Sequence, residues 1–372
     1  MRKNLKKLVY AIMFMATVVM TFSVTDMAKA STIAQTTENT SGASVIKIGD
    51  DCYYVLDGVI RVDYTGLAQI GSNWWYVENG KLNDSYTGLV QNEYGWWYVE
   101  NGKIDFTHTG LVQNEYGWWY VKNGTIDFSY NDVCFHSGVY WYILDGKVDF
   151  SVDGFAERGG SWYYFKNGAV QNITGLVLNE AGWWYVENGK INASYVGLVE
   201  NEYGWWYVKN GTIDFNYTGF AKNENGWWYV KAGGVVSDPT EKNINACLFA
   251  LKQVGKGYSQ EKRWDENYFD CSSLAYRAWK SVGVDISYGG ATTAAEEARG
   301  LAAAGKSFFD TENLQMGDLI FYSSSTNGRY MNITHVAIYV GNGMIVDARG
   351  KDYGVVYRVL PKSNIVLLGR PM

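Results

Sequence analysis

Proline is scarce in this chain of 372 residues, which has 3 prolines against 42 glycines. Charged side chains are also few, at 19%, and the net charge of −6 leaves no basic surface of the kind that nucleic acid requires. An apolar content of 47% excludes wholesale disorder. With 30 tyrosines and 16 tryptophans, the composition predicts short aromatic strands joined by glycine turns, and the length predicts more than one domain.

Long apolar runs are lacking except for one, from Leu8 to Val24. Four basic residues precede it, and the small residues Ala28 and Ala30 follow it at the spacing of a cleavage site. This layout predicts a secretory signal peptide over residues 1–30, because the run is short for a membrane anchor. We therefore expect an exported protein that has no membrane partner once the signal is cleaved.

Cysteine and histidine are few. Cys52 and Cys134 lie too far apart in the repeat array described below to form a disulfide. The C-terminal region holds only Cys247, Cys271 and one histidine, His335. These residues are too few, and too poorly spaced, for a metal site. The sequence predicts neither a metal nor an organic cofactor.

A repeat of about 22 residues fills the middle of the chain. Nine copies align on a pair of residues, usually aromatic, and such a period is typical of an array built from one supersecondary unit. We place the array at residues 46–235, after a linker at 31–45. The pairs are Cys52-Tyr53, Trp74-Trp75, Trp96-Trp97, Trp118-Trp119, Tyr140-Trp141, Trp162-Tyr163, Trp183-Trp184, Trp205-Trp206 and Trp227-Trp228.

Each repeat carries a hairpin signal. Residues 96–99 are aromatic and β-branched, Asn101-Gly102 follows, and residues 103–106 complete the pattern. Residues 110–112 are expected to connect this hairpin to the next repeat. One hairpin cannot bury its aromatic face alone, so the repeats must stack.

The doubled tryptophans are candidates for ligand binding. Neighbouring side chains of a strand point to opposite faces, so we expect one tryptophan of each pair to pack in the core and the other to line a surface groove. Exposed rings suit sugars or quaternary ammonium groups. The acidity of this segment either attracts a cation or keeps the array soluble. The candidates are Trp74, Trp75, Trp96, Trp97, Trp118, Trp119, Trp183, Trp184, Trp205, Trp206, Trp227 and Trp228.

In their Trp-Tyr/Val, Asn-Gly and Thr-Gly elements, these repeats resemble the choline-binding and glucan-binding cell-wall repeats of Gram-positive surface proteins. The resemblance implies a β-hairpin solenoid that holds the protein on a wall glycan or teichoic acid, with choline as a possible ligand. The choline-binding pattern has Gly-Trp where this chain has Gly-Leu, as at Gly110-Leu111. One wall of the aromatic cage is therefore missing unless the doubled tryptophan replaces it.

A second domain is expected at residues 243–372, after a linker at 236–242 that contains Pro239. The spacing of apolar residues predicts helices at 244–254, 271–282 and 292–304. Short apolar runs predict strands at 318–322, 335–340, 344–348 and 355–359. Helices followed by antiparallel strands indicate an α+β layout. The predicted fold class is thus multidomain, a β-hairpin repeat solenoid followed by an α+β domain.

Cys271 opens the second of these helices, where the helix dipole and free N–H groups favour a thiolate and can hold an oxyanion. His335 opens a strand. Taken singly they are also compatible with an inert buried thiol and a strand-edge histidine, but together they are the parts of a thiol nucleophile. Asp347 is the candidate third member. A two-residue turn would set it opposite Ile338, on the wrong face; a longer loop or a bulge would set it opposite Ala337, on the face of His335.

At residues 269–274, 316–321 and 335–343, together with Tyr258, the domain resembles the papain-like NlpC-type cell-wall peptidases. The resemblance implies hydrolysis of peptidoglycan stem peptides, usually between γ-D-glutamate and the diamino acid, with Cys271 as nucleophile, His335 as base and Asp347 as third residue. It also places Tyr258, Asp270 and Ser272 at positions that in some relatives hold the free amine of the stem peptide. Asp347 stands where His, Asn or Gln is usual, and Ser273 replaces a glycine.

These observations predict a secreted cysteine peptidase that cuts peptidoglycan while its repeats hold it on the wall of a Gram-positive-type bacterium. Two alternatives remain open at this stage. One is a surface adhesin with a degenerate C-terminal domain, and the other is an amidase that cuts a different wall bond with the same thiol.

Overall fold

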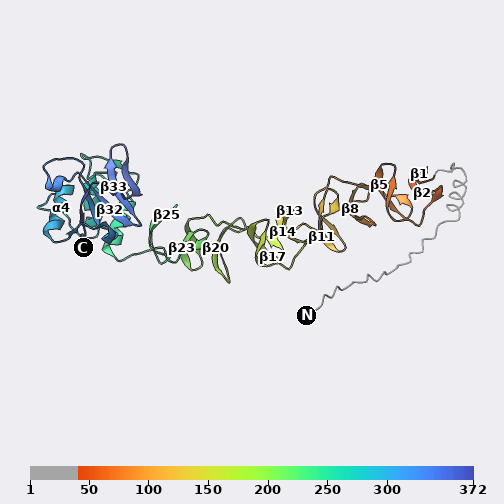
Figure 1. The fold of residues 1–372 in the computed structure, drawn as a ribbon, viewed down its shortest axis with the longest axis horizontal. Coiled ribbons are helices and arrows are strands. Elements are labelled where there is room, and N and C mark those ends of the chain that lie inside the picture. Colours follow the sequence, from red (N-terminus) through yellow and green to blue (C-terminus); the bar gives the residue numbers. More distant parts are fainter. Residues whose placement is uncertain (1–40) are drawn as a thin grey trace. The chain divides into compact units, whose positions relative to one another are not determined.

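The computed structural model describes residues 41–372 (Figure 1). The predicted signal peptide and most of the predicted linker at 31–45 lie outside the described residues. The chain divides into two compact units, one up to Ser151 together with Asn167–Ala169, the other Val152–Lys166 together with Val170–Met372. Among residues 41–372, no helix has the length and apolar character needed to span a membrane.

The first unit consists of three-stranded repeats, and its first strand begins three residues before the predicted start of the array. The strands are β1 (Ala43–Ile48), β2 (Asp51–Leu56), β3 (Val59–Ile60), β4 (Gly66–Ile70), β5 (Asn73–Glu78), β6 (Lys81–Leu82), β7 (Gly88–Asn92), β8 (Gly95–Glu100), β9 (Lys103–Ile104), β10 (Gly110–Asn114), β11 (Gly117–Lys122), β12 (Thr125–Ile126), β13 (Val133–His136), β14 (Val139–Leu144) and β15 (Lys147–Val148).

Each repeat holds two hairpins that share a middle strand. In the third repeat, β7 pairs with β8 over five residues, and β8 pairs with β9 through the turn at Asn101-Gly102. The expectation that the segment at 110–112 only connects repeats is therefore wrong: it forms β10, the first strand of the fourth repeat. Repeats join where Thr125 of β12 pairs with Trp97 of β8.

The Asn-Gly turn is confirmed, and two separate constraints require its glycine. Asn101 and Gly102 both have positive φ, 48° and 75°, as a tight hairpin turn demands. A Cβ on Gly102 would also lie 2.5 Å from the carbonyl oxygen of Asn83 in the preceding repeat. The turn therefore fixes both the hairpin and the close stacking of neighbouring repeats.

The buried core of the array is mainly aliphatic and also contains rings such as those of Tyr98 and Phe165. Val99 is fully buried, as are its equivalents Val77, Val121 and Ile143. All twelve doubled tryptophans are half-buried, so the expectation that one of each pair lies in the core is wrong. Trp97 and Val99 share one face of β8, but the indole lies at the rim, where its Nε1 donates to Oδ1 of Asn92 at 3.0 Å.

The second unit begins with four further repeats and continues into the α+β domain. β18 (Ala169–Val170) spans the boundary between the units. The other repeat strands are β16 (Gly154–Arg158), β17 (Ser161–Lys166), β19 (Gly175–Asn179), β20 (Gly182–Glu187), β21 (Lys190–Ile191), β22 (Gly197–Asn201), β23 (Gly204–Lys209), β24 (Thr212–Ile213), β25 (Gly219–Asn223), β26 (Gly226–Lys231) and β27 (Gly234–Val236).

The α+β domain has its helices first and its sheet after, as predicted. Its helices are α2 (Lys242–Leu251), α3 (Cys271–Ser281) and α4 (Ala294–Ala303), with short 3-10 turns η1 (Thr311–Asn313) and η2 (Tyr330–Asn332). Its strands are β28 (Gly257–Tyr258), β29 (Tyr268–Phe269), β30 (Ser307–Phe308), β31 (Leu319–Tyr322), β32 (His335–Gly341), β33 (Met344–Gly350), β34 (Gly354–Val359) and β35 (Ile365–Gly369).

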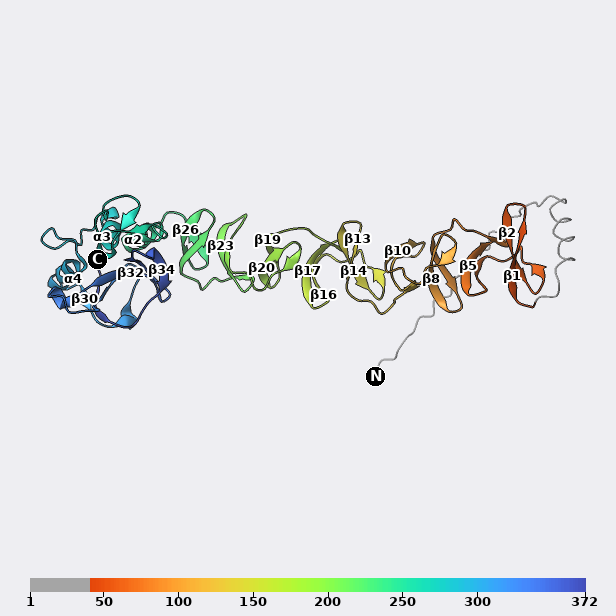
Figure 2. The same cartoon turned by 90° about the horizontal axis from the view of Figure 1, so that it is seen from above.

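Six of these strands form an antiparallel sheet in the order β30-β35-β31-β32-β33-β34. Helix α3 packs on β32 and β33 (Figure 2), and Cys271 at the start of the helix comes within hydrogen-bonding reach of His335 at the start of β32. Trp279 and Leu274 of α3 are almost fully buried in the core between helix and sheet. The strands β30 and β35 were not predicted; β30 is only two residues long, and both lie at one side of the sheet.

The ninth repeat shares this core. Phe220 and Tyr229 belong to the same buried cluster as Ile244 of α2. Asn342 donates from Nδ2 to the carbonyl oxygen of Thr218 at 3.3 Å. The predicted linker at 236–242 thus joins two elements that are packed together within the second unit.

Candidate active site

Cys271 is the first residue of α3, and its half-buried side chain lies where the helix begins. Asp270 caps the helix: its Oδ1 accepts from the Ser273 N–H at 2.7 Å, and Ser273 Oγ accepts from the Asp270 N–H at 3.0 Å. This reciprocal capping box fixes the first turn. It also gives the serine that replaces the usual glycine a structural role.

A bulge brings Asp347 to the side of His335. The hairpin between β32 and β33 has the short turn at Asn342-Gly343, but its register shifts between Tyr339 and Gly341, and Ile338 then pairs with Val346. Continuing this register sets Asp347 opposite Ala337, which is the arrangement that the sequence required of a triad. His335 Nε2 and Asp347 Oδ2 are 2.7 Å apart.

The surroundings of His335 favour its protonated form. Burial opposes the charge, but hydrogen bonds with Asp347 and with Cys271 outweigh it and raise the pKa of His335 to about 9. Because Nε2 faces Asp347, Nδ1 is the nitrogen left for the thiol. Burial also opposes the charge of Asp347, yet His335 and Arg358 together lower the pKa of that carboxyl. The site therefore holds an imidazolium beside a thiol and a carboxylate.

Arg358 on β34 is a fourth member that the sequence reasoning missed. Its Nε donates to Asp347 Oδ1 at 2.9 Å and its Nη2 to Oδ2 at 2.7 Å. Arg358 lies opposite Ile345, two residues from Asp347 on the same face of β33. An arginine near the end of a strand is also typical of an exposed edge, so no signal in the sequence distinguishes it.

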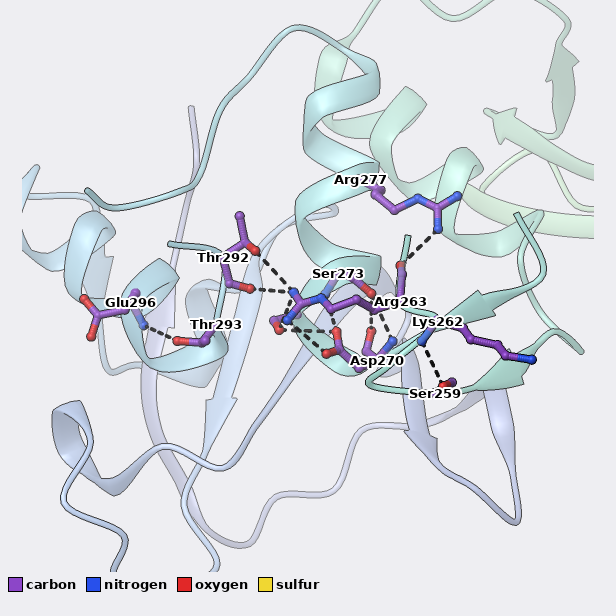
Figure 3. Close-up of polar contacts among 10 residues, drawn as sticks. Ser259, Lys262, Arg263, Asp270, Ser273, Arg277, Thr292, Thr293 and Glu296 are labelled. Carbon is purple, nitrogen blue, oxygen red and sulfur yellow. Dashed lines mark hydrogen bonds and ion pairs between the residues drawn. The ribbon is translucent and has the colours of Figure 1, made fainter. Parts of the chain in front are cut away.

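Asp270 is already paired with a cation of this chain, Arg263 (Figure 3), which also contacts Ser272. Arg263 Nη1 lies 3.1 Å from Asp270 Oδ2, and its Nη2 donates to Ser272 Oγ at 3.2 Å and to the carbonyl oxygen of Thr292 at 2.7 Å. A substrate amine could reach Asp270 only by displacing this guanidinium. Tyr258 lies near the same groups: burial, with Cys271 and Asp270 adding to it, raises the pKa of its hydroxyl.

Glu297 on α4 is fully buried, and neither of its carboxyl oxygens has a hydrogen-bond partner among the described residues. Burial raises the pKa of Glu297 well above its usual range, with Cys271 adding to the shift. Glu297 is therefore held in its neutral form. Nothing in the sequence distinguishes it from Glu296 beside it.

Cys247 has a different environment from Cys271. It is fully buried in α2, its Sγ lies 3.5 Å from the carbonyl oxygen of Tyr339, and burial raises the pKa of its thiol. All four cysteines are free thiols. Cys271 is thus the thiol placed beside an imidazole.

The first unit contains an aromatic pocket. A cavity of about 350 Å³ is lined by Trp74 of the second repeat and by Asn92, Tyr94, Trp97, Ile104 and Phe106 of the third. The Trp74 and Tyr94 rings meet edge to face, with centroids 6.2 Å apart, as do those of Trp97 and Phe106 at 5.8 Å. The first tryptophan of one repeat and the second of the next are therefore two walls of one cage.

The same ring pattern recurs twice more, and the other doubled tryptophans differ from it. Trp75 faces the Lys103 ammonium group, 4.3 Å from the ring centre, and Trp227 packs against Tyr357 of β34 with ring centroids 4.8 Å apart. The recurring cages are Trp96, Tyr116, Trp119 and Phe128 in the first unit, and Trp183, Tyr203, Trp206 and Phe215 in the second.

Comparison with known proteins agrees with both halves of this description. Residues 255–365 match the model of the NlpC/P60 family. Eight consecutive segments between residues 63 and 235 match the choline-binding repeat, and the first of the nine structural repeats precedes them. The chain carries an NlpC/P60 domain preceded by choline-binding repeats.

Two Bacillus proteins are among its relatives. The bifunctional muramidase/DL-endopeptidase CwlT of Bacillus subtilis strain 168 is 32% identical over 125 residues, which are 32% of this chain and 34% of that protein. The peptidoglycan DL-endopeptidase CwlO of Bacillus licheniformis is 36% identical over 84 residues, 22% of this chain and 16% of that protein. This chain thus spans about a third or less of their length.

Among solved structures, NlpC1 from Trichomonas vaginalis has a TM-score of 0.31 at 19% identity, over 70% of this chain and 84% of that chain.

Proposed function

We propose that this protein is a secreted cysteine endopeptidase that cuts peptidoglycan stem peptides between γ-D-glutamate and the diamino acid. The observation that carries the proposal is the helix-start thiol of Cys271 beside a His335 imidazole bound to Asp347 at 2.7 Å. The DL-endopeptidase names of the two Bacillus relatives support the choice of bond.

The residues divide the reaction among them. Cys271 Sγ, as the thiolate, attacks the amide carbonyl, and the backbone N–H groups of Cys271 and Ser272 hold the oxyanion. His335 gives its Nδ1 proton to the leaving amine and then takes a proton from the water that hydrolyses the thioester. Asp347 accepts a hydrogen bond from His335 Nε2 and stabilises the imidazolium throughout the reaction.

The repeats hold the enzyme on the wall through their aromatic cages. Each cage offers several ring faces within one cavity, which suits a quaternary ammonium group such as choline on a teichoic acid, or a sugar ring. Several cages on one chain raise the local concentration of stem peptides without changing the chemical step. We accordingly propose that the protein acts outside the cell, attached to the wall.

Mass spectrometry of digested peptidoglycan tests the proposal. New γ-glutamyl carboxyl ends, matched by new amino ends on the diamino acid, are the expected result. Freed lactyl ends would instead show an amidase. Wall binding without any soluble product would show an adhesin whose C-terminal domain does not catalyse.

A further inference from the structure

The interaction between Arg358 and Asp347 is a fork of two hydrogen bonds that engages both carboxylate oxygens. Nε reaches Oδ1 at 2.9 Å and Nη2 reaches Oδ2 at 2.7 Å. The Asp347 side chain is 0% exposed and that of Arg358 is 25% exposed. Two parallel bonds fix the plane of a carboxylate, which one bond does not. Asp347 therefore presents Oδ2 to His335 in one orientation.

The fork also settles the charge of the pair. A fully buried carboxylate without a paired cation is strongly disfavoured, so it would take up a proton or turn away from the site. With the guanidinium bound, Asp347 and Arg358 together carry no net charge, yet Oδ2 still accepts from His335.

Four groups face this centre from the elements packed around it. Cys271 comes from α3, Asp347 from β33, Arg358 from β34 and Tyr322 from β31, whose ring centroid lies 6.0 Å from that of His335. The Tyr322 hydroxyl is buried and has no partner among the described residues. Arg358 is thus the cation that the surrounding elements supply to balance Asp347.

We propose that Arg358 is a positioning residue for the hydrolysis: it holds the Asp347 carboxylate in the orientation and charge state in which that group orients His335. The proposal rests on the proposed function for its catalytic consequence. Arg358 acts through Asp347 and does not touch the thiol or the substrate.

The experiment compares three variants of the full chain: Arg358→Met, Arg358→Lys and, as a matched control, Arg370→Met. Arg370 forms the same fork on the buried Asp318, with both bonds at 2.8 Å. Asp318 precedes β31 at the end opposite Tyr322, the residue that pairs with His335. The control therefore removes an equivalent ion pair from the same sheet without touching the site.

The readouts are the titration of His335 by NMR with labelled histidine and turnover of a soluble stem peptide. The chain has 3 histidines, so the His335 signal can be assigned with one substitution. In Arg358→Met we expect the titration midpoint of His335 to fall by roughly one pH unit, because without the guanidinium Asp347 takes up a proton or turns away and no longer stabilises the imidazolium. We expect turnover to fall by roughly 10- to 100-fold, as for other outer-shell partners.

Arg358→Lys keeps the charge, so its midpoint should stay near that of the parent protein while turnover recovers in part. Arg370→Met should lower the unfolding temperature and leave the His335 midpoint where it is. An unchanged midpoint in folded Arg358→Met, or an equal shift in Arg370→Met, would overturn the proposal. A shift in Arg358→Met in a protein that cleaves no stem peptide would uphold the positioning and refute the proposed function.

Discussion

His335 Nε2 and Asp347 Oδ2 are 2.7 Å apart only because β32 carries an extra residue near its turn. Without the bulge between Tyr339 and Gly341, the short turn at Asn342-Gly343 would direct Asp347 to the other face of the sheet. The bulge therefore places His335 and Asp347 on the same face of the sheet, where they form the proposed catalytic pair.

Substitutions of Asp347 should show how far the site depends on the orientation of the His335 ring and how far on the negative charge beside it. Asp347→Asn keeps one acceptor for the imidazole and should retain partial activity. Asp347→Leu cannot orient the ring and should lose roughly two to four orders of magnitude in kcat. Turnover of a stem peptide measures both, with circular dichroism to show that each variant folds. A leucine variant as active as the parent protein would reduce the site to Cys271 and His335.

The pH dependence should follow His335. Since the pKa of His335 is raised to about 9, the imidazolium that protonates the leaving amine persists through neutral pH, and kcat/KM should fall only as pH passes about 9. In Asp347→Asn the loss of the carboxylate should move this fall to lower pH. A pH profile with the same basic limb in both proteins would contradict the assignment.

Stability should change over the same range. The folded-state pKa of His335 lies above the ordinary value of 6.5, so protonation stabilises the fold fully below about pH 6.5, and this stabilisation is lost as pH rises through about 9. Urea unfolding at pH 6 and pH 10 measures the difference. His335→Gln should remove this part of the pH dependence; an unchanged slope would show that other groups cause it.

The positions of the aromatic cages predict which tryptophans bind the wall ligand. In the full chain carrying Cys271→Ala, Trp97→Ala removes one wall of a cage, and the affinity of that site should fall by roughly 5- to 30-fold, for the loss of 1–2 kcal/mol. Trp162→Ala is the control, because this ring is 48% exposed and the next repeat has Ala181 and Ala193 where the cages have tyrosine and phenylalanine. Fluorescence titration with choline, and separately with a wall oligosaccharide, identifies the ligand. Equal effects of both substitutions would contradict the cage assignment.

A short and a long deletion of the repeats should affect the stability of the remaining protein differently. Deleting residues 46–151 removes repeats of the first unit and should lower activity on intact walls while sparing a soluble stem peptide. Deleting residues 46–235 also removes Phe220 and Tyr229 from the core, at roughly 2–3 kcal/mol for each. That variant should melt at a lower temperature. If it were as stable as the shorter deletion, the ninth repeat would not be part of the catalytic fold.

Much of this architecture follows from local patterns in the sequence. The 22-residue period, the Asn101-Gly102 turn and the helix that starts at Cys271 each depend on neighbouring residues, and the structure contains all three. The core position of Val99 could not be predicted, because it depends on which residues stacked repeats cover on both faces of a strand. Arg263, Glu297 and Arg358 were missed because their partners are distant in sequence and are brought near only by the tertiary fold.

The central claim is that the Cys271 thiol is the nucleophile. The most direct test is the release of soluble muropeptides from purified walls by the full chain, by Cys271→Ala and by Cys247→Ala, with wall binding measured alongside. We predict that Cys271→Ala binds walls like the parent protein and releases nothing, whereas Cys247→Ala, whose thiol is fully buried and faces no base, still releases them. Release by Cys271→Ala at a rate comparable to that of the parent protein would contradict the account.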